Sequence, residues 1–212
     1  MSGVLDSVAV SAVILAGGAA SRLGRDKALE EVGGKPMLTR VVDAVRLIAT
    51  EIVIVGDSSG RQHLDLPEIV RWTTDRYPGS RGPLAGLHAG AKESTNDLLL
   101  AVGCDMPFLN PIVLGMLVRA GASGFAEAVV PRIDGRAQPL HAVYRRDPVI
   151  ERAEQLLESD GRTGIQDLIR RLRAQYFGEE DVTPFDPDLR SFWSVNTADD
   201  LEHVRPIAGG GE

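Results

Sequence analysis

The stretch that decides the fold of this chain is VAVSAVILAGGAASRLGRDK, residues 8–27. It begins with an apolar run and ends in paired glycines followed by basic residues. Such a short continuous apolar run is typical of a strand that is buried on both faces of a parallel sheet. Glycines directly after a strand let the backbone turn sharply and approach a bound phosphate closely. The stretch therefore predicts an α/β sheet with an anion-binding loop after its first strand.

Three cations, Arg22, Arg25 and Lys27, follow the glycines Gly17 and Gly18 in this loop. The loop is not a Walker A motif, in which Gly-Lys precedes Ser or Thr, and it lacks the G-x-G-x-x-G spacing of dinucleotide-binding folds. A tight turn with solvated surface cations is the alternative interpretation. The concentration of cations in an otherwise acidic chain favours phosphate binding.

Apolar strands and amphipathic helices alternate outward from this loop. We expect strands at 8–16, 51–56, 68–72, 97–103, 126–130, 139–144, 175–177 and 192–195. We expect helices at 36–49, 83–93, 111–120, 147–157 and 164–172, with a last helix opened by Asn196-Thr197. The turn Asp134-Gly135 is expected to join the strands at 126–130 and 139–144. This alternation predicts a mostly parallel sheet whose ligands bind beyond the carboxyl ends of the strands.

Composition and charge limit the possible partners. A net charge of −7 argues against broad nucleic-acid binding, because phosphate contacts require an excess of Lys and Arg. The single cysteine, Cys104, cannot form an internal disulfide, which fits a reducing compartment. The first apolar run is too short for a membrane span and follows Asp6 rather than a basic segment, which argues against a signal peptide. We expect a cytoplasmic protein without nucleic-acid or membrane partners.

Asp105 stands at the end of a very apolar run, LLLAVG at 98–103. A carboxylate at the end of a buried strand is partly desolvated, so it needs a partner or a metal ion. Mg²⁺ takes one or two carboxylates together with phosphate oxygens and water. The alternative is an aspartate that caps the turn before Pro107. The neighbouring Cys104 is expected to be a buried filler rather than a nucleophile.

Two segments carry a resemblance to a known family. LAGGAASRLGRDK, residues 15–27, resembles the signature L-A-G-G-x-S-x-R-M-G-x-D-K of the MobA-like nucleotidyltransferases, and CDMPF at 104–108 resembles their metal-binding segment. Leu23 in place of methionine is one departure from that signature. The resemblance implies a three-layer α/β/α Rossmann-like nucleotidyltransferase fold with a mostly parallel central sheet. It implies one domain over residues 1–212, with an ordered core at about 10–205 and a flexible tail at 206–212.

The resemblance also implies roles for individual residues. The catalytic set would be Arg22, Lys27 and Asp105, with Asp105 as the Mg²⁺ ligand. The nucleotide would be bound by Leu15, Ala16, Gly17, Gly18, Lys27, Asp75, Gly82 and Asp105. Gly82 belongs to GPLAG at 82–86, where a helix N-terminus offers free N–H groups to an anion.

On the acceptor side, the resemblance points to Gln138, His141 and Asn196. A lone histidine on a strand is more often a structural residue, and Asn196 is by its own chemistry an ordinary helix N-cap. Ser194 stands where some relatives carry another asparagine. Gly56 likewise replaces a polar residue that some relatives have after the second strand.

The implied reaction is transfer of GMP from GTP to the terminal phosphate of molybdopterin, with Mg²⁺ as cofactor and release of pyrophosphate. Proteins that deliver or receive the pterin cofactor are possible further partners. Gly17 resembles the guanylyl-transferring members, since cytidylyl-transferring relatives more often read L-A-A-G. Two alternatives stay open: a cytidylyltransferase acting on molybdopterin or another small phosphorylated acceptor, and a non-catalytic guanine-nucleotide sensor. Asp105 argues against the sensor, which needs no metal ligand at the α-phosphate.

Overall fold

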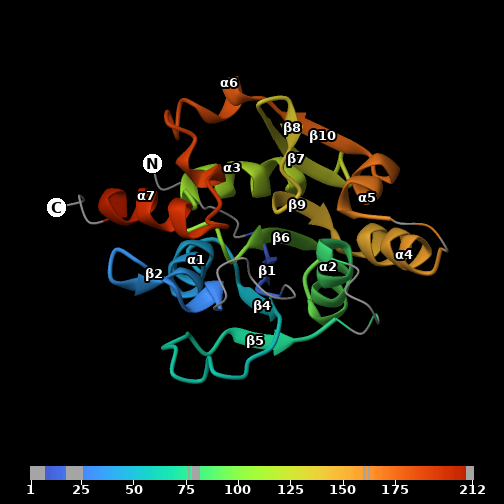
Figure 1. Cartoon of the computed structure of the whole chain (residues 1–212). Helices are drawn as coiled ribbons and strands as arrows, with labels where there is room; N and C mark the ends of the chain where they lie inside the picture. Colours follow the sequence, from blue (N-terminus) through green and yellow to red (C-terminus); the bar gives the residue numbers. More distant parts are fainter. Residues whose placement is uncertain are drawn as a thin grey trace, which may run out of the picture.

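The structure, a computed structural model, describes residues 8–17, 26–75, 77, 82–159, 161 and 163–208. Its centre is a mixed sheet in the order β10-β7-β9-β6-β1-β4-β5, shown in Figure 1. The strands are β1 (Val10–Leu15), β4 (Glu51–Val55), β5 (Val70–Thr73), β6 (Leu98–Gly103), β7 (Ala128–Ile133), β9 (His141–Arg145) and β10 (Ala174–Phe177). The neighbours β6, β1, β4 and β5 are parallel, whereas β9 is antiparallel to both β6 and β7. The expected mostly parallel sheet is confirmed.

Helices cover both faces of this sheet (Figure 1). One face packs against α1 (Met37–Val45) and α3 (Pro111–Ala122), and the other against α2 (Gly82–Glu93), α4 (Arg146–Leu157) and α5 (Ile165–Arg171). Alternate residues of β1 serve the two faces, since Ile14 belongs to the first core cluster and Val13 to the second. The expected three-layer α/β/α arrangement is confirmed.

Smaller elements lie at the margins of the layers. They are the hairpin β2 (Glu31–Val32) and β3 (Lys35–Pro36), the strand β8 (Arg136–Ala137), the 3₁₀ helices η1 (Lys27–Leu29) and η2 (Arg190–Phe192), and the helices α6 (Glu179–Val182) and α7 (Ala198–Ala208). α7 continues to Ala208, past the point at which the ordered core was expected to end, and the tail from 209 onward lies outside the described residues. Among the described residues, no helix has the length and apolarity needed to cross a membrane.

Two expected elements are wrong in detail. Asp134 and Gly135, both with positive φ, join β7 to the short β8 rather than to β9. The strand expected at 192–195 does not form: η2 ends at Phe192, and the chain beyond it crosses the end of β6, where Val195 N donates to Asp105 O at 2.8 Å. The segment therefore packs over the end of the sheet, with Val195 fully buried, and does not add a strand to a sheet edge.

Helix α2 approaches β1 closely because it carries glycines where it crosses the strand. A Cβ atom at Gly90 would lie 2.3 Å from Val13 Cγ1, inside any real contact distance. By contrast, a Cβ at Gly115 in α3 would lie 3.5 Å from Ile48 Cδ1, which is ordinary contact. The α2–β1 interface therefore requires glycine at position 90.

We predict that Gly90→Ala destabilises the fold by about 1–3 kcal/mol, because overpacking outweighs the better helix propensity of alanine. Gly115→Ala is the matched control, and it should stabilise by roughly 0.5–1 kcal/mol through helix propensity alone. Urea unfolding of both variants measures the two effects. Equal shifts in the same direction would show that the close approach at Gly90 has no energetic consequence.

Candidate functional site

The carboxyl ends of the four parallel strands are tied together by backbone hydrogen bonds. Cys104 N donates to Leu15 O at 3.0 Å, Ala16 N to Val55 O at 2.9 Å, and Gly56 N to Thr73 O at 2.8 Å. The loops that follow β6, β1, β4 and β5 therefore start at one common edge. This is the edge at which ligands bind in open α/β sheets.

The turn after β1 lies against the backbone of the next loop. A Cβ atom at Gly56 would be 2.8 Å from Ala16 O, so any side chain there would collide with the Ala16–Gly17 peptide. The absence of a polar side chain at position 56 thus has a steric reason. Gly17 itself is exposed at the sheet edge, as binding through its backbone requires.

Arg61, a residue that sequence reasoning missed, holds this turn in place. Its Nη2 donates to Ala16 O at 3.0 Å, and its Nε and Nη2 donate to the two carboxylate oxygens of Asp26 at 2.6 and 2.8 Å. The side chain is only 8% exposed, and its guanidinium carbon lies 5.6 Å from the ring centroid of Trp72. In sequence, Arg61 stands in a polar loop without apolar periodicity, so no pattern marked it as buried.

Lys27 reaches the site from η1 and meets the closing segment of the chain. Its Nζ donates to Asn196 Oδ1 at 2.8 Å. Asn196 is not the N-cap of α7, as had been expected, because Thr197 Oγ1 accepts from Asp200 N and Asp200 in turn accepts from Thr197 N. The Asn196 side chain instead holds Lys27 through Oδ1, while its Nδ2 donates to Ser194 Oγ at 2.8 Å. Two residues predicted separately, one catalytic and one on the acceptor side, are in direct contact.

Asp105 lies in the turn after β6, close enough to Lys27 for their charges to interact. Burial raises the pKa of its carboxyl, and the positive charge of Lys27 counteracts part of that rise. Within the described residues, no group of three or more His, Cys, Asp or Glu side chains could hold a metal ion. Mg²⁺ is commonly held by one or two carboxylates together with phosphate oxygens and water, and does not need such a cluster. The half-buried Asp105 carboxyl fits such an ion.

Cys104 does not supply a nucleophile. Burial, together with the negative charge of Asp105, raises the pKa of its thiol to about 12. The thiol is therefore protonated at neutral pH, and a protonated thiol is a poor nucleophile. The role expected for it as a small filler fits its packing against the core cluster under α1 and α3.

Of the other residues predicted to bind the nucleotide, the structure describes some and not others. Asp75 is exposed just after β5, and Gly82 begins α2 with φ +65°, a conformation that favours glycine. Leu15 ends β1 and packs against Gly86 of α2. Gly18 and Arg22 lie outside the described residues, so their predicted roles stay predictions.

On the acceptor side, His141 is not placed for a binding role. It is fully buried, and its ring stacks on Phe192 with centroids 4.3 Å apart. Neither ring nitrogen meets a hydrogen-bond partner with acceptable geometry among the described residues. The backbone of Ser191 and the charge of Asp186 favour a protonated ring, but burial outweighs both and lowers the pKa of the imidazole. The structural interpretation of a lone strand histidine is the one that this arrangement supports. Gln138 lies at the turn before β9, half-buried, and its amide donates to Arg136 O.

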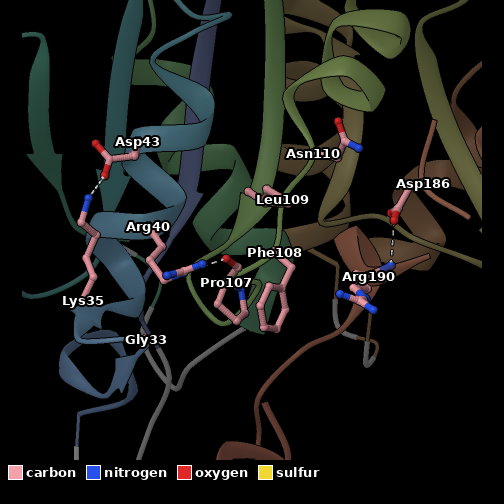
Figure 2. A pocket seen from close by; sticks show the side chains of 10 residues that line it. All are labelled: Gly33, Lys35, Arg40, Asp43, Pro107, Phe108, Leu109, Asn110, Asp186 and Arg190. Atoms are coloured by element: carbon pink, nitrogen blue, oxygen red, sulfur yellow. Dashed lines mark hydrogen bonds and ion pairs between the residues drawn. The ribbon is translucent and has the colours of Figure 1, made fainter. Parts of the chain in front are cut away.

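A cavity lies on the α1 and α3 side of the molecule, apart from the candidate site. Its volume is about 490 Å³, and Figure 2 shows the side chains that line it. Its three cations already have partners: Lys35 pairs with Asp43, Arg40 donates to Pro107 O, and Arg190 pairs with Asp188. None of the described site residues lines this cavity, so we do not assign the candidate site to it.

Comparisons with known proteins identify the family of this chain. Residues 12–179 match the family described as MobA-like NTP transferase domain. A protein of Desulfosudis oleivorans named molybdenum cofactor guanylyltransferase is 34% identical over 204 residues, covering 96% of this chain and 98% of its own. A Natranaerobius thermophilus protein named probable molybdenum cofactor guanylyltransferase is 30% identical over 200 residues, covering 94% and 97%.

Solved structures show the same fold. Molybdopterin-guanine dinucleotide biosynthesis protein A of Archaeoglobus fulgidus superposes with a TM-score of 0.80 at 27% identity, covering 95% of this chain and all of its own. The 4-diphosphocytidyl-2C-methyl-D-erythritol synthase of Anaerococcus prevotii superposes with a TM-score of 0.69 at 17% identity, covering 95% and 96%. At that identity the second similarity shows the fold alone.

The buried His141 predicts a pH dependence of stability. Burial lowers the pKa of its imidazole to about 4, below the ordinary value of 6.5. Between these two values the unfolded chain binds more protons than the folded one, so the free energy of unfolding falls as the pH is lowered from 6.5 to 4. We expect His141 to account for about 3 kcal/mol of that loss.

His141→Leu should therefore flatten the pH dependence of stability over this range, whatever its effect at pH 7. Urea unfolding of wild type and variant at a series of pH values measures both slopes. Parallel curves would contradict the burial of a neutral imidazole at this position.

Proposed function

This chain belongs to the MobA-like NTP transferases, and we propose that it transfers GMP from GTP to the terminal phosphate of molybdopterin, with release of pyrophosphate. The observation that carries the chemistry is the meeting of Lys27, Asn196 and Asp105 at the sheet edge where the Ala16–Gly17 turn begins. The choice of GTP and molybdopterin is supported by the relatives named as molybdenum cofactor guanylyltransferases, which match this chain over nearly its whole length.

The main chain and cations of the site would bind the triphosphate. Gly17 is exposed at the edge and carries no side chain that would keep a phosphate away, whereas Ala16 before it is buried. Lys27, oriented by Asn196, would neutralise the leaving pyrophosphate, and Arg22 shares this role by position in the sequence. Transfer of this kind depends on positioning and charge neutralisation more than on covalent catalysis.

Mg²⁺ is the cofactor that Asp105 fits best. Its carboxylate would hold the ion, and a bound Mg²⁺ supplies charge neutralisation at phosphate oxygens. Burial raises the pKa of Asp105 and so disfavours the ionised carboxylate that a metal requires. The positive charge of Lys27 acts in the opposite direction and favours the ionised form. Asp105 would thus bind the metal ion, and Lys27 would bind the phosphate beside it.

The attacking group needs no protein base. A phosphate monoester has its second pKa near 6, so roughly nine-tenths of it is dianionic at neutral pH. Two groups could otherwise suggest base or nucleophilic catalysis, but both are neutral at neutral pH: Cys104 because its pKa is raised, and the buried His141 because its pKa is lowered. The chain's contribution would be to hold the triphosphate and to place the charge of Lys27 near Asp105.

We predict that Asp105→Ala and Lys27→Ala each reduce turnover by about 10²-fold or more, on the order of 3 kcal/mol of transition-state stabilisation, while the fold survives. The measurement is pyrophosphate release from GTP in the presence of isolated molybdopterin. Asp147→Ala and Lys92→Ala are matched controls, because both residues form ion pairs on helices away from the site. Near wild-type turnover in an Asp105 or Lys27 variant would refute the role of that residue.

Nucleotide choice is tested separately from turnover. We predict that GTP with Mg²⁺ raises the melting temperature more than CTP with Mg²⁺, since a ligand that binds only the folded state stabilises it according to its affinity. Stabilisation by CTP alone would favour a cytidylyltransferase. Stabilisation by GTP without pyrophosphate release from any acceptor would favour a nucleotide sensor.

A further inference from the structure

We infer that Arg61 is a positioning residue for nucleotide binding: its guanidinium fixes both the Ala16–Gly17 peptide and Asp26, and thereby holds in place the Gly17 amide and the start of η1 that would meet a triphosphate. This inference rests on the proposed function for its ligand. It adds a residue from a different loop, between β4 and β5, to the machinery of the site. Arg61 itself need not touch the nucleotide.

The first step is that Arg61 binds the two flanks of the loop at once. Ala16 precedes the paired glycines in the sequence, and Asp26 lies between the last two cations of the loop, Arg25 and Lys27. One guanidinium donates to both, with distances of 2.6–3.0 Å. The separation of the two flanks is therefore set by a single rigid group.

The second step concerns the direction of the Gly17 amide. A trans peptide is planar, so its carbonyl and its N–H point in opposite directions. Because the Ala16 carbonyl accepts from Arg61, the Gly17 N–H must point away from Arg61. Gly56 lies against the same peptide, since a Cβ atom there would be 2.8 Å from Ala16 O and 3.1 Å from Gly17 N, so this close approach requires a glycine. The donor that a phosphate would use is thus aimed before any ligand arrives.

The third step links Asp26 to Lys27. Asp26 Oδ1 accepts from Ala28 N at 3.1 Å and so caps η1, the short helix that begins with Lys27. Burial alone would raise the pKa of Asp26, but the hydrogen bonds from Arg61 and Ala28 outweigh it and hold the pKa below its usual range. Arg61 thus keeps the cap ionised, and the cap orients the backbone that carries the Lys27 side chain.

The fourth step explains why an arginine is needed. A guanidinium presents several donors in a rigid plane, whereas an ammonium is a single point charge on a flexible stem. Arg61 Nη1 is buried without a hydrogen-bond partner among the described residues, a cost to stability. The hydrogen bonds from Nε and Nη2 to Asp26 and Ala16 offset that cost. A single ammonium could not reach Ala16 O and both Asp26 oxygens with this geometry, so the arrangement calls for an arginine.

The experiment compares Arg61→Gln, Arg61→Lys and Asp26→Asn with the wild type and with Arg71→Gln. Arg71 is the matched control, since it also pairs with a carboxylate, Glu51, but at the opposite end of the parallel strands. Three quantities are measured: hydrogen exchange of backbone amides in peptides covering residues 15–29 without nucleotide, the Kd for GTP with Mg²⁺ by calorimetry, and the KM values for GTP and molybdopterin. Thermal unfolding reports whether each variant is folded.

We expect Arg61→Gln and Asp26→Asn to speed exchange in residues 15–29 while the peptides of β6 and α3 stay protected. The Kd and KM for GTP should rise by about 10- to 100-fold, and the KM for molybdopterin should not change. Arg61→Lys should resemble Arg61→Gln, because one ammonium cannot replace the hydrogen bonds that the guanidinium donates to Ala16 and Asp26. The double variant Arg61→Gln/Asp26→Asn should be no worse than either single variant, since both remove one interaction.

Wild-type exchange and GTP affinity in Arg61→Lys would overturn the inference, as would a uniform loss of protection across the sheet or an equal rise of both KM values. Asp26→Asn keeps the test decisive if Arg61 variants fail to fold, because Asp26 is one-third exposed. Failure of the proposed function looks different: the wild type would then bind no GTP, while the loop exchange would still respond to Arg61→Gln.

Discussion

Parallel pairing of β1 with β4 on one side and β6 on the other is the constraint on which the site depends. It brings the ends of four strands to one edge, and the backbone bonds from Cys104, Ala16 and Gly56 fix their heights relative to one another. The loops after these strands therefore begin close together, and their residues can reach one site at this edge. The same pairing buries both faces of β1, and this burial gives the loop after it a rigid base.

At that edge the structure holds opposite charges at the boundary of a low-dielectric core. Asp105 loses stability as an anion through burial and regains part of it from Lys27. Lys27 is in turn held by Asn196, and Asp26 by Arg61. Charges that are fixed in this way need little rearrangement when a phosphate arrives, and such preorganisation is the main source of electrostatic catalysis.

Local patterns were sufficient where a residue's role follows from its neighbours in sequence. The strand that ends at Leu15 and the buried strand before Asp105 were predicted, because burial of a strand follows from a short apolar segment. The turn expected at Gly17-Gly18 continues into residues outside the described part of the chain and stays a prediction. The partners across the site were not predictable. Arg61 approaches Asp26 from another loop, and its polar surroundings in sequence are those of a surface residue.

In the closing segment, by contrast, tertiary contacts overruled a plausible local pattern. FWSV at 192–195 has strand-forming residues, but Val195 N bonds to Asp105 O, and the capping box of Thr197 and Asp200 replaces Asn196 as the cap of α7.

The contacts of this closing segment have a consequence for biosynthesis. The bonds from Val195 to Asp105 and from Lys27 to Asn196 join residues far apart in the chain, and Asn196 lies beyond residue 179, where the match to the family ends. Domains generally fold from the N-terminus as synthesis proceeds. A ribosome-bound chain that has released the central sheet but not residues 192–208 therefore lacks the contacts of Asp105 with Val195 and of Lys27 with Asn196, and the lysine acquires this partner only after the sheet has emerged.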